Sequence, residues 1–244
     1  MKRVAVVTGA SRGIGRACAL RLARDGISIV VNYNNSPEKA MEVVEEIKKA
    51  GSESIAIKAD VSSSKEVQAL FRETINHFGQ LDILVNNVGI VDDSFIMMLG
   101  DSSLDKSLSI NLKSYFYCCK QAALKMFKQR RGKIINISSV SSIKGIPGQS
   151  VYSATKGAIN SMTGALAAEL AQYGIQVNAV APGFIDTDML NSVPEDKKKQ
   201  YIDLIPLKRF GKADEVAETV SFLCSGNVDY ITGQVIIIDG GLSI

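Results

Sequence analysis

Short apolar runs recur along the chain, and segments with the period of an amphipathic helix separate them. The runs are rich in valine and isoleucine and fall at residues 3–9, 27–33, 54–60, 81–87, 132–139, 175–183 and 234–240. Continuous apolar runs of this length are typical of strands that are covered on both faces. The pattern predicts an α/β protein with a parallel sheet of about seven strands and helices on both faces.

Residues 37–51 illustrate the helical period between two such runs. Met41, Val44 and Ile47 fall on one face, which we expect to be buried, and the charged residues fall on the other. No repeat, low-complexity tract or linker interrupts the alternation. We therefore expect residues 1–244 to form a single domain with a Rossmann-type, doubly wound sheet.

Composition excludes several classes of protein. Hydrophobic residues make up 46% of the chain and charged residues 22%, which is ordinary for a soluble globular protein. The net charge is only +3 and no basic run is interleaved with aromatics, so nucleic-acid binding gains no support. No apolar stretch reaches the roughly 18 residues of a membrane span. The apolar run at the amino terminus passes straight into a glycine loop, so we interpret it as a strand and not as a signal peptide.

Cysteine and histidine usage narrows the chemistry further. The four cysteines, Cys18, Cys118, Cys119 and Cys224, show no C-x-x-C spacing, which predicts neither a disulfide framework nor a zinc site and favours a reducing cytoplasm. His77 is the only histidine, and we interpret it as structural. We expect no metal, and proton chemistry would have to use a group other than histidine.

A glycine-rich turn follows the first apolar run. Gly9, Gly13 and Gly15 precede a helical segment, and glycines allow a backbone to turn tightly and approach a pyrophosphate that the helix amino terminus attracts. The spacing is G-x-x-x-G-x-G and not the G-x-G-x-x-G of the common dinucleotide fingerprint. The turn alone is therefore also compatible with a purely structural role.

The second run favours one nicotinamide cofactor over the other. NAD sites usually carry an acid about 20 residues after the glycines, but here residues 32–35 read Asn-Tyr-Asn-Asn. Arg12, inside the glycine turn, can supply a cation for a 2′-phosphate. We expect NADP(H) in preference to NAD(H), with a solvated surface arginine as the alternative for Arg12.

Tyr152 and Lys156 are four residues apart in a predicted helix and so share one face. The stretch VYSATKGAIN contains no carboxylate that would pair with the lysine. A surface pair on an amphipathic helix is the alternative to a catalytic pair.

Taken together, the motifs TGASRGIG, DV, NNVG, YSATK with a serine thirteen residues before it, and PGFIDT resemble those of the short-chain dehydrogenase/reductase family. The resemblance covers essentially the whole chain and is greatest to the 3-oxoacyl-(acyl carrier protein) reductases. One residue departs from the family pattern: Val88 occupies the usual alanine of N-N-A-G, which could narrow the cofactor groove.

The resemblance implies a catalytic set of Asn111, Ser139, Tyr152 and Lys156. Tyr152 would give a proton to the developing alkoxide, and a nearby cation should lower its ordinary pKa of about 10. Lys156 would tune Tyr152 and bond the nicotinamide ribose, Ser139 would donate to the substrate oxygen, and Asn111 would hold a water in a proton relay.

The implied cofactor contacts include the adenine at Asp60, the adenosine ribose at Asn87, and the carboxamide and phosphates at Ile185 and Thr187. The full expected cofactor-binding set is Gly9, Ser11, Arg12, Gly13, Ile14, Gly15, Asn32, Asn34, Asp60, Val61, Asn87, Gly89, Tyr152, Lys156, Pro182, Gly183, Ile185 and Thr187.

The substrate is less constrained. Residues 187–211 are mostly polar and predict a mobile lid. By resemblance, Arg130 and the adjacent Arg131 would meet an acidic acyl carrier protein, although a second expected basic position holds Tyr173. We expect NADPH-dependent reduction of a 3-oxoacyl thioester in fatty acid or polyketide synthesis. Reduction of another ketone, such as a sugar, polyol or secondary metabolite, and a non-catalytic NADP-binding regulator are the alternatives.

Apolar residues that we expect at the surface predict that the protein forms an oligomer. Residues 104–127 carry apolar side chains on more than one side, and Leu242 and Ile244 keep the end of the chain apolar. Burial of this surface against a neighbour, together with the resemblance, predicts a homotetramer.

Overall fold

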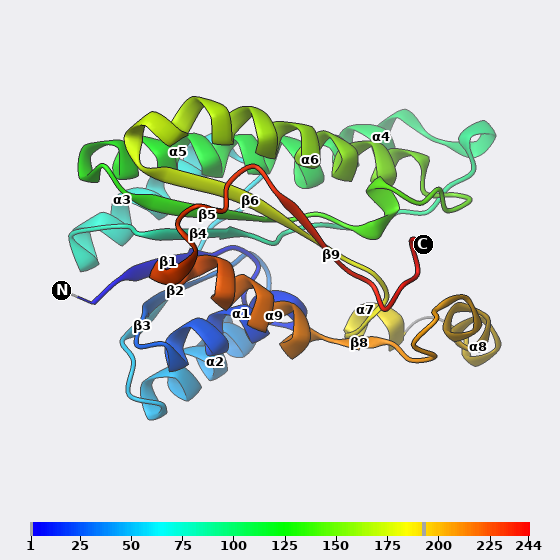
Figure 1. Ribbon diagram of the computed structural model, residues 1–244, viewed down its shortest axis with the longest axis horizontal. Coiled ribbons are helices and arrows are strands. Elements are labelled where there is room, and N and C mark those ends of the chain that lie inside the picture. The colour runs from blue at the N-terminus through cyan, green and yellow to red at the C-terminus, as the bar shows by residue number, and fades with distance from the viewer. Residues whose placement is uncertain (1, 192–193) are drawn as a thin grey trace.

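Seven parallel strands form the central sheet in a computed structural model that describes residues 2–191 and 194–244 (Figure 1). The strand order is β3-β2-β1-β4-β5-β6-β9, so the order reverses between β1 and β4. All seven expected strands are confirmed: β1 (Val4–Val7), β2 (Ser28–Tyr33), β3 (Ser54–Lys58), β4 (Ile83–Asn86), β5 (Gly132–Ile137), β6 (Ile175–Pro182) and β9 (Val235–Ile238). In such sheets the crevice at the reversal, beyond the carboxyl ends of the strands, is the usual ligand site.

Helices cover both faces of the sheet (Figure 1). One layer contains α1 (Gly13–Arg24), α2 (Pro37–Lys49) and α9 (Ala213–Cys224), and the other contains α3 (Ser64–Phe78), α4 (Asp101–Leu108), α5 (Ser114–Gln129) and α6 (Ser150–Leu170). Each layer packs on its own cluster of buried apolar side chains. The strands are covered on both faces, as the continuous apolar runs predict. None of the helices in the described ranges is long and apolar enough to cross a membrane.

The expected buried face of α2 needs one correction. Val44 and Ile47 are buried, but Met41 is about half exposed, and Ala40 and Val43 complete the buried stripe. The stripe follows the spacing i, i+3, i+4, i+7, whereas Met41 lies one position round from it.

Several shorter elements connect the main helices and strands. They are β7 (Ile185–Asp186) and β8 (Gly211–Lys212), which pair in parallel, the helices α7 (Asp188–Asn191) and α8 (Glu195–Leu204), the 3₁₀ turns η1 (Ile96–Met98), η3 (Val140–Ser142), η4 (Ala171–Tyr173) and η5 (Gly226–Val228), and the π-helical turn η2 (Ser109–Lys113). The expected lid at 187–211 corresponds to α7, α8 and the strand β8, with residues 192–193 outside the described ranges.

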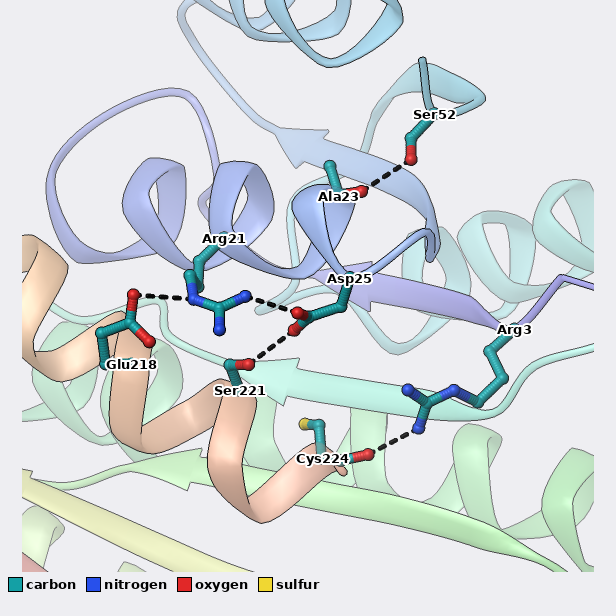
Figure 2. Close-up of polar contacts among 8 residues, drawn as sticks. All are labelled: Arg3, Arg21, Ala23, Asp25, Ser52, Glu218, Ser221 and Cys224. Carbon is teal, nitrogen blue, oxygen red and sulfur yellow. Dashed lines mark hydrogen bonds and ion pairs between the residues drawn. The ribbon is translucent and has the colours of Figure 1, made fainter. Parts of the chain in front are cut away.

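Polar contacts join α9 to the end of α1 (Figure 2). Asp25 accepts hydrogen bonds from Arg21 at 2.6 Å and from Ser221 of α9 at 2.5 Å. Arg21 also donates to Glu218 of α9 at 2.7 Å. Burial alone would raise the pKa of Asp25, but the bonds from Arg21 and Ser221 hold it below its usual value. These contacts hold α9 against the carboxyl-terminal end of α1.

Candidate active site

A cavity of about 880 Å³ opens at the carboxyl ends of the central strands. Seventeen of the eighteen residues expected to bind the cofactor line it, all except Gly15. Three of the four expected catalytic residues line it as well, all except Asn111. Its lining includes Gly9, Ser11, Arg12, Gly13, Ile14, Asn32, Asn34, Asp60, Val61, Asn87, Gly89, Ser139, Tyr152, Lys156, Pro182, Gly183, Ile185 and Thr187. Segments far apart in the sequence therefore converge on one site.

The glycine turn needs its glycines for two different reasons. Gly9 and Gly13 have φ values of +62° and +55°, in the left-handed region that favours glycine. A Cβ on Gly15 would lie 2.5 Å from the carbonyl oxygen of Gly9, so any side chain there would push the turn apart. Gly15 therefore shapes the cavity without lining it. Because α1 begins at Gly13, free N–H groups and the positive end of its dipole lie at the cavity.

Two amides hold the glycine turn against the sheet. The side-chain oxygen of Asn32, which is buried, accepts from the N–H of Gly9 at 3.3 Å, and its amide nitrogen donates to Ala59 at 3.1 Å. The amide of Asn87 donates to the carbonyl of Thr8 at 3.1 Å. Both side chains thus position the cavity wall.

The far end of the cavity has the features expected for a 2′-phosphate. Arg12 and Asn34 are exposed there, and the guanidinium of Arg12 forms no ion pair with any described residue. No carboxylate lies among residues 32–35. Asp60 also lines the cavity, and its Oδ1 accepts from the N–H of Ser62 at 2.9 Å and from its hydroxyl at 2.7 Å.

Tyr152 lines the cavity, and burial is the largest influence on its pKa. Burial raises the pKa of Tyr152 above its ordinary value, a hydrogen bond from Ser139 lowers it, and the charge of Asp93 raises it. The net direction is upward, because burial outweighs the Ser139 hydrogen bond, and the tuning of Tyr152 by Lys156 stays a prediction. Lys156 is itself buried, which lowers its own pKa to about 7 and so weakens its charge near neutrality.

Lys156 lies between two tyrosine rings. Its Nζ is 5.7 Å from the ring centroid of Tyr152 and 5.2 Å from that of Tyr115. It donates to the carbonyl of Ile137 at 2.8 Å and to the hydroxyl of Tyr115 at 3.3 Å. The alternative of an exposed surface pair is excluded, because both Tyr152 and Lys156 line the cavity and Lys156 is buried.

Asn111 is fully buried in the π-helical turn and does not line the cavity. Its side-chain oxygen accepts from the N–H of Ile90 at 2.8 Å, and its amide donates to the carbonyl of the same residue at 2.9 Å. Both functions of the amide are thereby used to hold the loop after β4. The water-holding role expected for Asn111 stays a prediction.

Several polar residues of the cavity were not singled out from the sequence. Ser139 donates to Ser141 at 3.3 Å, Ser141 donates to Gln149 at 2.9 Å, and Gln149 donates to Asp93 at 3.4 Å. This chain of hydrogen bonds links Ser139 to a carboxylate at the cavity wall. Tyr115, which contacts Lys156 but does not line the cavity, was not singled out from the sequence either. None of these residues forms a local motif, so only the fold reveals them.

The cavity roof comes from the segment expected to be a lid. Tyr201 of α8 stacks on Phe184 with ring centroids 4.5 Å apart, and both residues line the cavity. Val88 also lines it, and its Cγ2 lies 3.0 Å from the place that a Cβ on Gly9 would occupy. The extra methyls of Val88 therefore pack directly against the glycine turn.

Arg130 and Arg131 lie outside this cavity, just before β5, whereas Ser139 follows the carboxyl end of that strand. Arg130 donates to the carbonyl of Gln172 at 3.1 Å and lies 5.7 Å from the ring centroid of Tyr173. Arg131 pairs with Asp82 at 3.1 Å. A six-residue strand spans about 20 Å, so this pair lies at the opposite edge of the sheet.

Comparison with known proteins places this site in context. A family model described as enoyl-(acyl carrier protein) reductase matches residues 9–243. The chain is 48% identical over 242 residues to a 3-oxoacyl-[acyl-carrier-protein] reductase, FabG, of Staphylococcus epidermidis, with 99% of each chain covered. It is 44% identical to a 3-oxoacyl-[acyl-carrier-protein] reductase of Synechocystis, with 98% of this chain and 96% of the relative covered.

Solved structures give the same picture. A short-chain dehydrogenase/reductase from Serratia marcescens superimposes with a TM-score of 0.94 at 36% identity, covering 99% of this chain and 98% of the other. Acetoin dehydrogenase YohF from Salmonella typhimurium gives a TM-score of 0.90, also at 36% identity, covering 99% and 97%.

Proposed function

This chain belongs to the short-chain dehydrogenase/reductase family, and we propose that it uses NADPH to reduce the ketone of a 3-oxoacyl thioester, carried by an acyl carrier protein, to the 3-hydroxyacyl form. One observation carries the proposal. Ser139 and Tyr152 share a cavity with the glycine turn, in a chain 48% identical over its full length to a reductase of that name. Fatty acid synthesis is the corresponding process.

The residues present fit a nicotinamide dinucleotide phosphate. The amino terminus of α1 and the glycine turn suit the pyrophosphate, and Arg12 suits the 2′-phosphate. NADPH, when bound, supplies the hydride that adds to the ketone carbon. Members of this family use NAD(H) or NADP(H), and the preference for NADP(H) is part of the proposal.

The protein supplies the proton and holds the carbonyl. Tyr152 donates its phenolic proton to the substrate oxygen, and its raised pKa keeps that proton in place near neutrality. Ser139 turns its single hydroxyl proton from Ser141 to the same oxygen and so stabilises the developing negative charge. Lys156 and, in the oxidised cofactor, the positive ring favour the phenolate that remains.

Three further expectations belong to this proposal. The roof formed by α7 and α8 acts as a lid, which the packing of Tyr201 on Phe184 supports. The protein assembles as a homotetramer, which the half-exposed Phe116, Leu124 and Phe127 along α5 support. Leu242 does not contribute, because it is buried within its own chain, whereas Ile244 is fully exposed. The cytoplasm is its expected location.

A substrate panel tests the proposal. NADPH oxidation is followed with acetoacetyl-carrier protein, a 2-enoyl-carrier protein, acetoin or its diketone, and a keto-sugar. We expect the 3-oxoacyl thioester to give the highest kcat/KM. The enoyl thioester is included because of the family model's description, and the diketone because of the likeness to acetoin dehydrogenase. Preference for either of these, or no turnover of the 3-oxoacyl thioester, would overturn the assignment.

A further inference from the structure

Tyr115 contacts the proposed catalytic lysine, although it does not itself line the cavity. It comes from α5, it is 1% exposed, and it is among the largest fully buried side chains of the protein. A phenol in such a place must find a partner for its hydroxyl, because an unpaired buried hydroxyl is costly. Its partners connect it to the site.

The hydroxyl of Tyr115 has two roles in one small network. It donates its only proton to the carbonyl of Ile137, at 2.8 Å, so its lone pairs remain available to accept. The ammonium of Lys156, 3.3 Å away, donates to that hydroxyl and donates also to the Ile137 carbonyl at 2.8 Å. The three groups form a closed triangle at the carboxyl end of β5.

The triangle accounts for two of the three N–H bonds of the ammonium. Lys156 also lines the cavity, so its third N–H is the one available to a ligand there. The face of the Tyr115 ring, 5.2 Å from Nζ, adds a cation–π contact. An ammonium without these partners would be buried with its charge poorly compensated.

We propose that Tyr115 is a positioning residue for Lys156: its hydroxyl fixes the direction of the ammonium and stabilises its charged form. The inference rests on the proposed function, since it assigns Tyr115 a part in NADPH binding through Lys156. It concerns a different residue from the proton donor, Tyr152.

The titratable groups around the ammonium define what a pH titration reports. They are Tyr115 from α5, Tyr152 from α6 itself and, beyond Tyr152, Asp93 from the loop after β4. The thiols of Cys118 and Cys119 lie beyond Tyr115 on α5, and burial raises the pKa of both. Burial raises the pKa of both phenols, so neither ionises near neutrality. Burial lowers the pKa of Lys156 to about 7, so Lys156 is the group that changes charge there.

Loss of the Tyr115 hydroxyl should move the pH dependence of NADPH binding to lower pH. NADPH favours the charged lysine, so its dissociation constant is flat below the Lys156 pKa and rises above it. In Tyr115→Phe the ring and its packing remain, but one acceptor of the ammonium is lost, which lowers the Lys156 pKa further. The rise should therefore begin about one pH unit lower, the size expected of one charge-assisted hydrogen bond.

Calorimetric titration of NADPH into each protein between pH 5.5 and 9 tests this, in steps of about half a pH unit. Titration of the cofactor's own phosphate is common to all variants and cancels in the comparison. Tyr117→Phe is the matched control, since Tyr117 lies on the same helix and packs on the apolar core. Its profile should coincide with that of the unmodified protein.

A double-mutant cycle separates positioning from simple packing. In a Lys156→Met background, Tyr115→Phe should have no further effect on NADPH affinity. Superimposable pH profiles for Tyr115→Phe and the unmodified protein, or an equal loss of affinity in both backgrounds, would overturn the inference. Failure of the unmodified protein to bind NADPH would instead refute the proposed function, so the two failures are distinguishable.

Discussion

Burial acts on the two ionisable groups of the site in opposite directions. It raises the pKa of Tyr152 and lowers that of Lys156 to about 7, because a buried environment favours the neutral form of each. A protonated phenol is the form that donates a proton to a ketone. The site is therefore suited to reduction near neutral pH, and nearby charges adjust it from there.

Asp93 supplies one such charge. It raises the Tyr152 pKa, so Asp93→Asn should lower that pKa and move the pH profile of alcohol oxidation, in which the phenolate is the base, to lower pH. The shift should be below one pH unit, since Asp93 is exposed and water screens it. The measurement is kcat against pH at saturating NADP⁺. Asp92→Asn, which removes a neighbouring carboxylate bonded to Ser103, is the control. A shift to higher pH would contradict the assignment.

Arg12 should determine the choice of cofactor. Arg12→Ala removes the cation expected at the 2′-phosphate, so the preference for NADPH over NADH should fall by about 10-fold or more, the size of a charge-assisted bond. Dissociation constants for both cofactors give the answer. Arg24→Ala, in the last turn of α1 and away from the cavity, should keep the preference. Equal affinities in the unmodified protein would refute the NADPH assignment.

Elements marked by a pattern of neighbouring residues could be predicted from the sequence. Elements that depend on contacts between distant segments could not. The seven strands are visible as apolar runs because burial on both faces makes most of their positions apolar. The π-helical turn and the β7–β8 pair depend on contacts between distant segments. The same division holds in the site, where the glycine turn and the Tyr152–Lys156 pair are local patterns. Tyr115 and Gln149 gain their roles only from neighbours that the fold provides.

The junction of α1 with α9 gives a stability prediction. The Asp25 pKa is held below its ordinary value, so its contribution is present above the unfolded-state pKa and is lost as pH falls through the folded-state pKa. Asp25→Asn should lower the free energy of unfolding at pH 7 by about 1 kcal/mol, and the difference should shrink towards pH 3. Urea unfolding at both pH values measures it. Asp105→Asn, an exposed acid on α4, should change little at either pH. A loss of equal size at pH 3 would contradict this account.

At the scale of the whole molecule, the residues expected to bind the carrier lie far from the cavity. Arg130 lies at the end of β5 opposite the cavity, so a carrier docked there would lie about 20 Å from the cavity of the same chain. Arg131 is less suitable as a probe, because its partner Asp82 is buried and would lose its cation. Arg130 is therefore the residue to test.

Arg130→Glu should raise KM for a carrier-bound thioester and leave KM for a small thioester analogue unchanged, because surface charges act mainly on encounter. The effect on the carrier-bound substrate should weaken at high salt. Lys49→Glu, at the end of α2, is a control of the same charge change. An equal rise in KM for both substrates would assign Arg130 to folding and not to carrier binding.

The most direct test of the whole account follows the hydride and the proton donor together. The protein is incubated with 3-oxoacyl-carrier protein and NADPH that carries deuterium at the transferred position, and the product is analysed by mass spectrometry. We expect a 3-hydroxyacyl thioester with one deuterium at C3. Tyr152→Phe should form it at least ~10²-fold more slowly while still binding NADPH. An unlabelled product, or an undiminished rate in Tyr152→Phe, would contradict the central claim.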